Sequence, residues 1–270
     1  MEIELLERQS SELRKDIVEV CYHSKAGHVG GSLSAIDILN VLYFNELRID
    51  PNNPKMENRD RFILSKGHIA EALYVTLAKR GFFAYSELDN FSGYNTKYIG
   101  HPNNKVAGVE MNTGALGHGL AIGVGLAIAA KKMGQDYRTY VLMGDGELAE
   151  GSIWESAMAA GHYKLDNLCA IVDRNHLQIS GCTETVMTLE DLKGKWQMFG
   201  FEVIETDGNN YEEIINAFTQ AKAIKNKPSL ILANTVKGKG VSFMENQASW
   251  HHGVLDAVQY KQALMELGDL

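Results

Sequence analysis

The sequence is poor in cysteine and proline. Its three cysteines, Cys21, Cys169 and Cys182, are odd in number and widely spaced, which fits neither a disulfide framework nor a zinc knuckle. With four prolines in 270 residues, no Pro-rich linker or obvious hinge divides the chain. These absences favour a reducing compartment, and we expect a cytoplasmic protein.

Long apolar runs and an excess of positive charge are also absent. The longest apolar stretch, residues 120–130, is too short to span a bilayer, and the charged amphipathic N-terminus is unlike a signal peptide. The formal net charge of −8 argues against a dedicated nucleic-acid surface, although it does not exclude a local site for a phosphorylated ligand. We therefore expect neither a membrane nor a nucleic acid as partner.

The hydrophobic pattern indicates an α/β protein. The first third is typical of helices, and from residue 138 short apolar runs alternate with helix-like segments. Strands without polar alternation, separated by helices, predict a doubly wound, mostly parallel sheet with helices on both faces. We expect one domain over residues 1–270, with strands at 138–143, 167–173, 201–206 and 228–236 and helices at 1–20, 34–44, 68–81, 152–163, 189–200 and 211–225.

Polar residues follow two successive predicted strands. Asp145 lies between Gly144 and Gly146, and Asn175 follows one strand–helix–strand unit later. Ligands of parallel sheets bind at the carboxyl ends of the strands, and carboxylate, amide and main-chain oxygens suit magnesium or calcium. Asp and Asn at these positions are also common turn and capping residues, so each residue alone favours that simpler interpretation. Together they favour a metal site.

Histidines recur in glycine-rich loops. Glycine permits close approach of a ligand, and imidazole can move a proton near neutral pH. A single histidine beside glycine is usually a hydrogen-bonded loop residue, but so many in one chain predict a shared site. The histidines are His28, His68, His101, His118, His251 and His252.

These motifs resemble those of thiamine-diphosphate enzymes, in which Gly-Asp-Gly precedes an Asn by a little under thirty residues; here 28 residues separate Gly146 from Asn175. The stretch "GDGELAEGSIWESAMAAGHYKLDNL" resembles transketolase in particular. So do "KAGHVG", "RDRFILSKGH", "GHPNN", "NTGALGHG" and "TVKGKGVSFMENQASWHH", which occur in the family's order.

The resemblance implies roles for particular residues. Asp145, Asn175 and the main-chain oxygen of Leu177 would ligate Mg2+, for which Ca2+ or Mn2+ could substitute, and Gly146 and Asn175 would contact the diphosphate. The catalytic residues facing the sugar hydroxyls would be His28, His101 and either His251 or His252. The remaining cofactor-binding residues would be His68 and Lys237 at the diphosphate, Gly114, Ala115 and Leu116 at the aminopyrimidine, and Glu150, which with Glu155 belongs to a network linking paired active sites.

Three positions depart from the family pattern. Val29 replaces proline, His118 replaces glutamine, and "WHHG" holds one histidine more than the family's "WHG". The last departure leaves open which of His251 and His252 acts. Helix charge alone is an equally good explanation of Glu150 and Glu155.

The resemblance also implies a partner. Transketolases carry a pyrimidine-binding domain and a C-terminal domain after the region seen here, so we expect the N-terminal subunit of a split transketolase. With a separate C-terminal subunit it would form a heterotetramer, two copies of each chain, that transfers a two-carbon ketol unit between sugar phosphates. Ordinary pentose phosphates are the default substrates, and branched or sulfonated sugars are the alternative.

Other classes remain as alternatives. A subunit of a 2-oxoacid dehydrogenase or a deoxyxylulose-phosphate synthase would share the cofactor, although the histidine loops favour transketolase. A nicotinamide enzyme would need Gly-x-Gly-x-x-Gly after a strand, and the nearest candidate, at Gly123 and Gly125, lies in a helical stretch. A non-catalytic binding protein would not need the metal and histidine sets.

Overall fold

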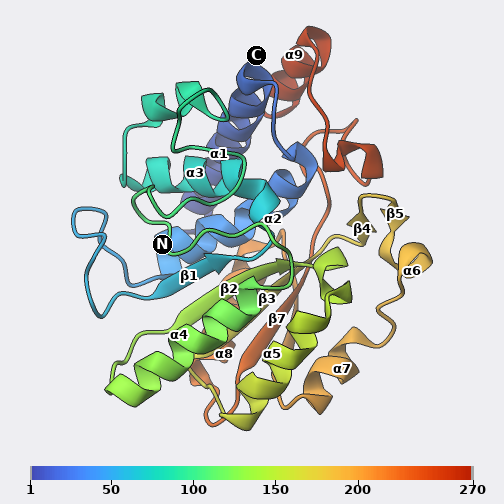
Figure 1. Ribbon diagram of the computed structural model, residues 1–270. Helices are drawn as coiled ribbons and strands as arrows, with labels where there is room; N and C mark the ends of the chain where they lie inside the picture. The colour runs from blue at the N-terminus through green and yellow to red at the C-terminus, as the bar shows by residue number, and fades with distance from the viewer. Residues whose placement is uncertain (1, 269–270) are drawn as a thin grey trace.

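A five-stranded parallel sheet forms the centre of the molecule. The computed structural model describes residues 2–268, and Figure 1 shows the sheet between two groups of helices. The strand order is β1-β2-β3-β7-β6, and each neighbouring pair is parallel. The strands are β1 (Arg61–Leu64), β2 (Thr139–Gly144), β3 (Leu168–Arg174), β6 (Glu202–Asp207) and β7 (Ser229–Asn234).

Both faces of the sheet are covered, which explains why the central strands are apolar without alternation. On β2, Tyr140 and Leu142 pack into the core on one face, and Val141 and Met143 pack into the core on the other. The first core includes α1 (Ile3–Ser24), α2 (Val29–Val41), α3 (Ala70–Arg80) and α8 (Tyr211–Ala223), with α9 (Ala257–Glu266) against α1. The second includes α4 (Gly119–Met133), α5 (Gly151–His162) and α7 (Leu192–Met198).

The register of the sheet aligns the strand ends that carry the predicted metal ligands. Gly144 pairs with Asp173 across β2 and β3, and Asp173 pairs with Ala233 across β3 and β7. The segments that follow these three strands therefore leave the sheet side by side at its carboxyl edge. This arrangement brings Asp145, Asn175 and Lys237 into one region, as expected for a ligand site in a parallel sheet.

The prediction of an α/β sheet covered on both faces is confirmed, but the first third of the chain is not entirely helical. Strand β1 lies there, because its short apolar run is buried at the sheet edge, a setting that periodicity does not distinguish from a buried helix. The predicted loop at 174–185 contains a hairpin, β4 (Leu177–Gln178) and β5 (Gly181–Cys182), followed by α6 (Thr183–Val186).

Five short helical turns complete the structure: η1 (Leu42–Glu46), η2 (Gly67–Ile69), η3 (Tyr85–Asn90), η4 (Gly146–Ala149) and η5 (Ala248–His251). Three of them, η2, η4 and η5, carry residues of the predicted site. Within residues 2–268, no helix has the length and apolar character needed to cross a membrane.

Candidate cofactor and active site

A cavity of about 280 Å³ opens at the carboxyl ends of β2 and β3. Eight predicted site residues line it: His68, Leu116, Asp145, Gly146, Asn175, Leu177, Lys237 and His251. A larger hollow of about 860 Å³ lies between α5 and α7, but its lining is mostly apolar and holds none of the predicted site residues. The smaller cavity is therefore the candidate site.

Asp145 is held by main-chain donors at the end of β2. Its carboxylate accepts hydrogen bonds from the amides of Gly146 at 2.7 Å and His176 at 2.6 Å, and Arg174 lies 3.3 Å away. Burial raises the pKa of Asp145, and the nearby carboxylate of Asp173 raises it further, against the opposing charge of Arg174. A bound cation would relieve this cost, since it stabilises the ionised form.

Asn175 is oriented by hydrogen bonds at the end of β3. Its amide nitrogen donates to Asp173 at 3.2 Å and to Ser34 at 3.3 Å, and its Oδ1 accepts from the amide of Leu177 at 3.1 Å. Asp173 itself ion-pairs with Lys66, and both side chains are almost completely buried. Burial opposes ionisation of Asp173, but the charge of Lys66 and the hydrogen bonds to it lower its pKa.

Lys237 reaches the cavity from the segment after β7. Its ammonium donates to the carbonyl of Leu177 at 3.3 Å and lies 3.0 Å from Nδ1 of His251. Burial lowers the pKa of Lys237 to about 8, and the charge of Lys66 adds to this effect. Lys66 is already ion-paired with Asp173, so the ammonium of Lys237, which contacts the neutral Leu177 carbonyl and His251 ring, is available to an anionic ligand.

Four of the predicted histidines form one cluster, and two of them, His68 and His251, line this cavity. The ring of His28 lies 5.1 Å from that of His68, 5.6 Å from that of His251 and 4.8 Å from that of His252, centre to centre. Burial and neighbouring positive groups lower the pKa of His28 to about 4 and that of His251 to about 3. Burial also lowers the pKa of His68. The imidazoles of His28, His68 and His251 are therefore neutral at pH 7 and can both donate and accept hydrogen bonds.

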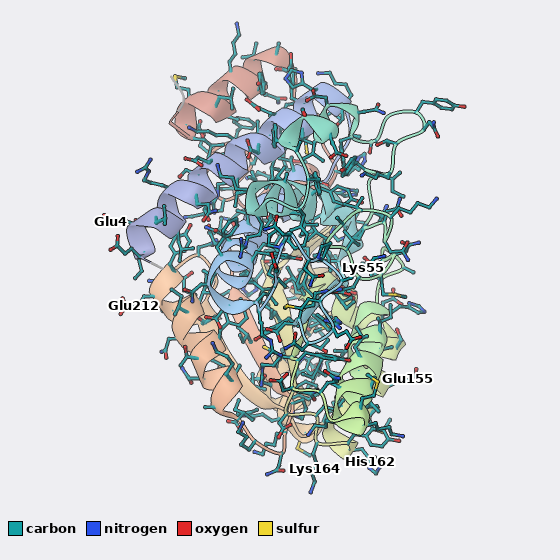
Figure 2. All side chains as sticks on the ribbon, turned by 90° about the vertical axis from the view of Figure 1, so that its left-hand side faces the viewer. Glu4, Lys55, Glu155, His162, Lys164 and Glu212 are labelled. Carbon is teal, nitrogen blue, oxygen red and sulfur yellow. The ribbon has the colours of Figure 1, made fainter. Side chains whose placement is uncertain are left out.

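Other predicted residues lie outside the cavity. His101 is exposed, and its ring packs against Gly114, where φ is +132° and a side chain would collide with the imidazole. Ala115 lines a separate shallow depression. Glu150 is exposed at the N-cap of α5, and Glu155 lies on the outer surface of that helix (Figure 2). These residues do not line the cavity, and the roles predicted for them stay predictions.

Sequence reasoning missed two buried charged residues at the site. Glu147 accepts hydrogen bonds from the hydroxyl of Ser65 and from the amides of Gly117 at 2.9 Å and Gly144 at 3.0 Å, so it ties three loops around the cavity. Lys66 holds Asp173 beneath Asn175. Both lie inside quoted motifs, "GDGELAEG" and "SKGH", but a charged residue in a loop gives no sequence signal of burial.

In the described residues, no group of three or more His, Cys, Asp or Glu side chains could hold a metal ion. A metal bound beside Asp145 would therefore need amide, main-chain and ligand oxygens as its other ligands. The fold and the polar residues that follow its strands define the class: an α/β protein with a ligand site at the carboxyl edge of a parallel sheet.

Comparison with known proteins specifies the class. Residues 7–269 match the family described as transketolase, thiamine diphosphate binding domain. The chain belongs to the transketolase family.

The relatives fall into two size groups. Over nearly its whole length the chain is 52% identical to one subunit of the apulose-4-phosphate transketolase of Phocaeicola vulgatus, covering 96% of that protein. It is 43% identical to the 6-deoxy-6-sulfo-D-fructose transketolase subunit SqwG of a Clostridium species, again covering 96%. It is 37% identical to human transketolase but spans only 42% of it. The crystal structure of Campylobacter jejuni transketolase superposes with a TM-score of 0.94 at 37% identity, and the chain covers 43% of that structure.

Proposed function

We propose that this chain is the cofactor-holding subunit of a two-chain transketolase. With a separate C-terminal subunit it would transfer a two-carbon ketol unit from a ketose phosphate to an aldose. The observation that carries the proposal is that subunits of split transketolases match this chain over 96% of their length, whereas single-chain transketolases extend far beyond it. Residues 1–270 would then form one thiamine-diphosphate-binding domain, with the pyrimidine-binding and C-terminal domains on the partner.

The residues present fit a diphosphate held through Mg2+. Asp145, Asn175 and the carbonyl of Leu177 supply three oxygens to one cavity, and Mg2+ takes its other ligands from phosphates and water. The ammonium of Lys237 already lies on the Leu177 carbonyl, where it would meet the diphosphate. Gly146 has no side chain to block this approach, and a Cβ there would collide with Gln178.

The remaining residues would act on the sugar. When bound, thiamine diphosphate supplies the carbon nucleophile and the electron sink for the two-carbon fragment. His28 and His252 lie ring to ring beside the two histidines that line the cavity, and their imidazoles would donate to and accept from sugar hydroxyls. His68 and His251 line the cavity itself and would bind the cofactor end. We assign His101, Gly114, Ala115 and Glu150 to the region completed by the partner.

The substrate we propose is a branched sugar phosphate, with apulose 4-phosphate as the first compound to test. Two apulose-4-phosphate transketolase subunits are 52% and 44% identical to this chain, against 43% for the sulfofructose enzyme and 37% for human transketolase. The free cysteines at 21, 169 and 182 support a reducing cytoplasm as the site of action.

The two-chain proposal is tested by assaying the purified chain with and without the product of a neighbouring C-terminal transketolase gene. We expect ketol transfer only from the mixture, and light scattering should give two copies of each chain. Apulose 4-phosphate should exceed xylulose 5-phosphate in kcat/KM. Robust transfer by this chain alone would overturn the two-chain proposal.

The metal assignment is tested by Asp145→Ala in the assembled enzyme. Calorimetry with thiamine diphosphate and Mg2+ should show at least a 100-fold loss of affinity, because the only carboxylate in the donor set is removed. Asp207→Ala, at the exposed end of β6 on the same sheet edge, is the matched control and should bind normally. Unchanged affinity in Asp145→Ala would refute the assignment.

A further inference from the structure

Glu71 is a buried carboxyl group outside the cavity, and nothing in the proposed chemistry uses it. It lies in the first turn of α3 with 0% of its surface exposed. Its Oε1 accepts hydrogen bonds from the amide of His28 at 2.6 Å and from the hydroxyl of Ser32 at 2.8 Å. Its Oε2 is buried without a hydrogen-bond partner. Burying a carboxyl group with one oxygen unpartnered lowers the stability of the fold, so its presence here needs a physical explanation.

The carboxyl group lies where the ends of three helices meet. His28 is the N-cap of α2 and has no side-chain cap of its own, so Glu71 satisfies the first free amide of that helix from another element. Glu71 also lies in the first turn of α3, where a negative charge is favoured. The thiol of Cys21, near the end of α1, is a third donor to it.

The loop before α2 is shaped to admit this contact. Gly27 has φ +129°, and a Cβ there would lie 2.5 Å from Sγ of Cys21 and 3.3 Å from Oε1 of Glu71. Only glycine allows the loop to close on the carboxyl group. His28 meets Glu71 through its main-chain amide, and its imidazole lies against the rings of His68, His251 and His252.

The same carboxyl group fixes two members of the histidine cluster relative to each other. His68 lies on η2, directly before α3, three residues from Glu71. His28 is bound to Glu71 through its amide, and its ring hydrogen-bonds the main chain of His68. A single buried group therefore connects the element that carries His68 to the loop that carries His28.

We propose that Glu71 is a positioning residue that holds the His28 imidazole in the substrate-facing histidine cluster. The proposal deepens the proposed function and rests on it for the role of His28. Its consequence for the reaction is specific: loss of Glu71 should act only through His28.

The first experiment does not depend on catalysis. Burial and the charges of its neighbours hold the pKa of His28 at about 4; the groups that face it are His68, His101, His251, His252 and Lys237. In Glu71→Ala the loop opens to water, and the His28 pKa should rise by at least one unit towards 6.5. Imidazole NMR titration of the purified chain, assigned with His28→Ala, measures this shift. An unchanged His28 titration in folded Glu71→Ala would overturn the proposal.

Two further variants distinguish positioning from loss of folding. Glu71→Gln keeps an acceptor oxygen for the His28 amide and places its NH2 where Oε2 has no partner, so it should retain the wild-type titration. Glu46→Gln is the matched control, since its carboxyl is only 2% exposed, ion-pairs with Lys222 and lies beyond the other end of α2. It should lower stability without moving the His28 titration. If Glu71→Ala does not fold, a shifted His28 titration in Glu71→Gln would overturn the proposal, and a wild-type one would support it.

The second experiment uses the assembled enzyme. Glu71→Ala should lower kcat/KM for the ketose by at least 30-fold, yet cost less than twofold when added to His28→Ala, because both changes remove the same interaction. Independent, multiplicative losses would overturn the positioning role. An assembled enzyme with no ketol transfer but a shifted His28 titration would refute the proposed function and leave the role of Glu71 intact.

Discussion

The molecule contains two buried groups of charged and polar side chains, and they differ in how well their charges are matched. The helix network consists of Arg14, Asp37, Asn209 and Tyr211. The pocket cluster consists of Lys66, Asp145, Asp173, Lys237 and His251. Both contain side chains that are almost inaccessible to water, so both carry a desolvation cost.

In the helix network each charge meets its partner. Asp37 accepts hydrogen bonds from Arg14 at 2.6 Å, from Tyr211 at 2.6 Å and from Asn209 at 2.9 Å. Burial opposes ionisation, yet Arg14 and these hydrogen bonds lower the pKa of Asp37. The charged form is therefore stabilised, and the network connects α1, α2 and the start of α8.

In the pocket cluster the Lys66–Asp173 pair is matched in this way, whereas Asp145 keeps a raised pKa although Arg174 lies 3.3 Å away. Burial raises the pKa of Asp145 and lowers that of Lys237, so both charges are held at a cost. Mismatched charges of this kind are typical of groups that await a ligand. We infer that well-matched buried charges belong to residues that stabilise the fold, and mismatched ones to residues that bind a ligand. Three experiments test this distinction.

The largest effect is expected from Asp37→Ala. Removing the carboxylate leaves Arg14 buried without its partner, and we expect a loss of about 3–5 kcal/mol in the free energy of unfolding. Urea denaturation followed by circular dichroism measures it. Asp136→Ala is the control, because its ion pair with Arg48 is exposed and should contribute nothing measurable. A loss in Asp37→Ala no greater than in the control would end the distinction between the clusters.

Lys237→Met should raise the free energy of unfolding instead of lowering it. The folded-state pKa of about 8 lies below the unfolded value of about 10.5, so at pH 7 burial of the ammonium costs about 3 kcal/mol. Losing the hydrogen bonds of Lys237 offsets about 1 kcal/mol of this gain. The variant should therefore be about 2 kcal/mol more stable than wild type while losing cofactor affinity.

The pH dependence of stability tests whether burial of the Lys237 ammonium causes this effect. Between pH 8 and 10.5 the unfolded chain binds more protons at Lys237 than the folded chain does, so wild-type stability from this group rises with pH across that window. In Lys237→Met, the part of this rise that comes from Lys237 should be missing from the urea midpoints measured across this pH range. Lys239→Met, in the same loop with its side chain 42% exposed, should retain it. A Lys237→Met protein that is less stable than wild type at pH 7 would contradict the assignment.

The smallest effect concerns His251. Burial and the charge of Lys237 lower its pKa to about 3, so the stability associated with its neutral ring is lost as pH falls from 6.5 towards 3. His251→Gln should therefore lose less stability than wild type between pH 7 and 4.5, measured by urea midpoints. The exposed His162 offers the control His162→Gln, which should follow wild type (Figure 2). Identical acid sensitivity in all three proteins would contradict the prediction.

Much of the fold was predictable because periodicity reports burial locally. The apolar runs of β2, β3, β6 and β7 and the amphipathic helices between them were recognised from their patterns. Strand β1 was missed, because four residues between helices carry too little pattern to distinguish a strand from a helix.

The position of the candidate site was predictable where residue type and spacing carry chemistry. Asp145 and Asn175 follow strands that the sequence revealed, and both line the cavity. The choice between His251 and His252 was not predictable, because neighbouring residues in a loop give no sign of direction. In the structure His251 lines the cavity and His252 lies beside His28.

The sequence by itself determined the alternation of strands and helices, the strand-end polar residues and the order of the glycine–histidine loops. Only the tertiary structure decided which charges are matched. Asp173 meets Ser34 and Lys66 across 139 and 107 residues of chain, and Glu71 meets His28 across 43. Local pattern governs secondary structure, but the electrostatic environment of a buried group depends on whichever distant segments pack around it.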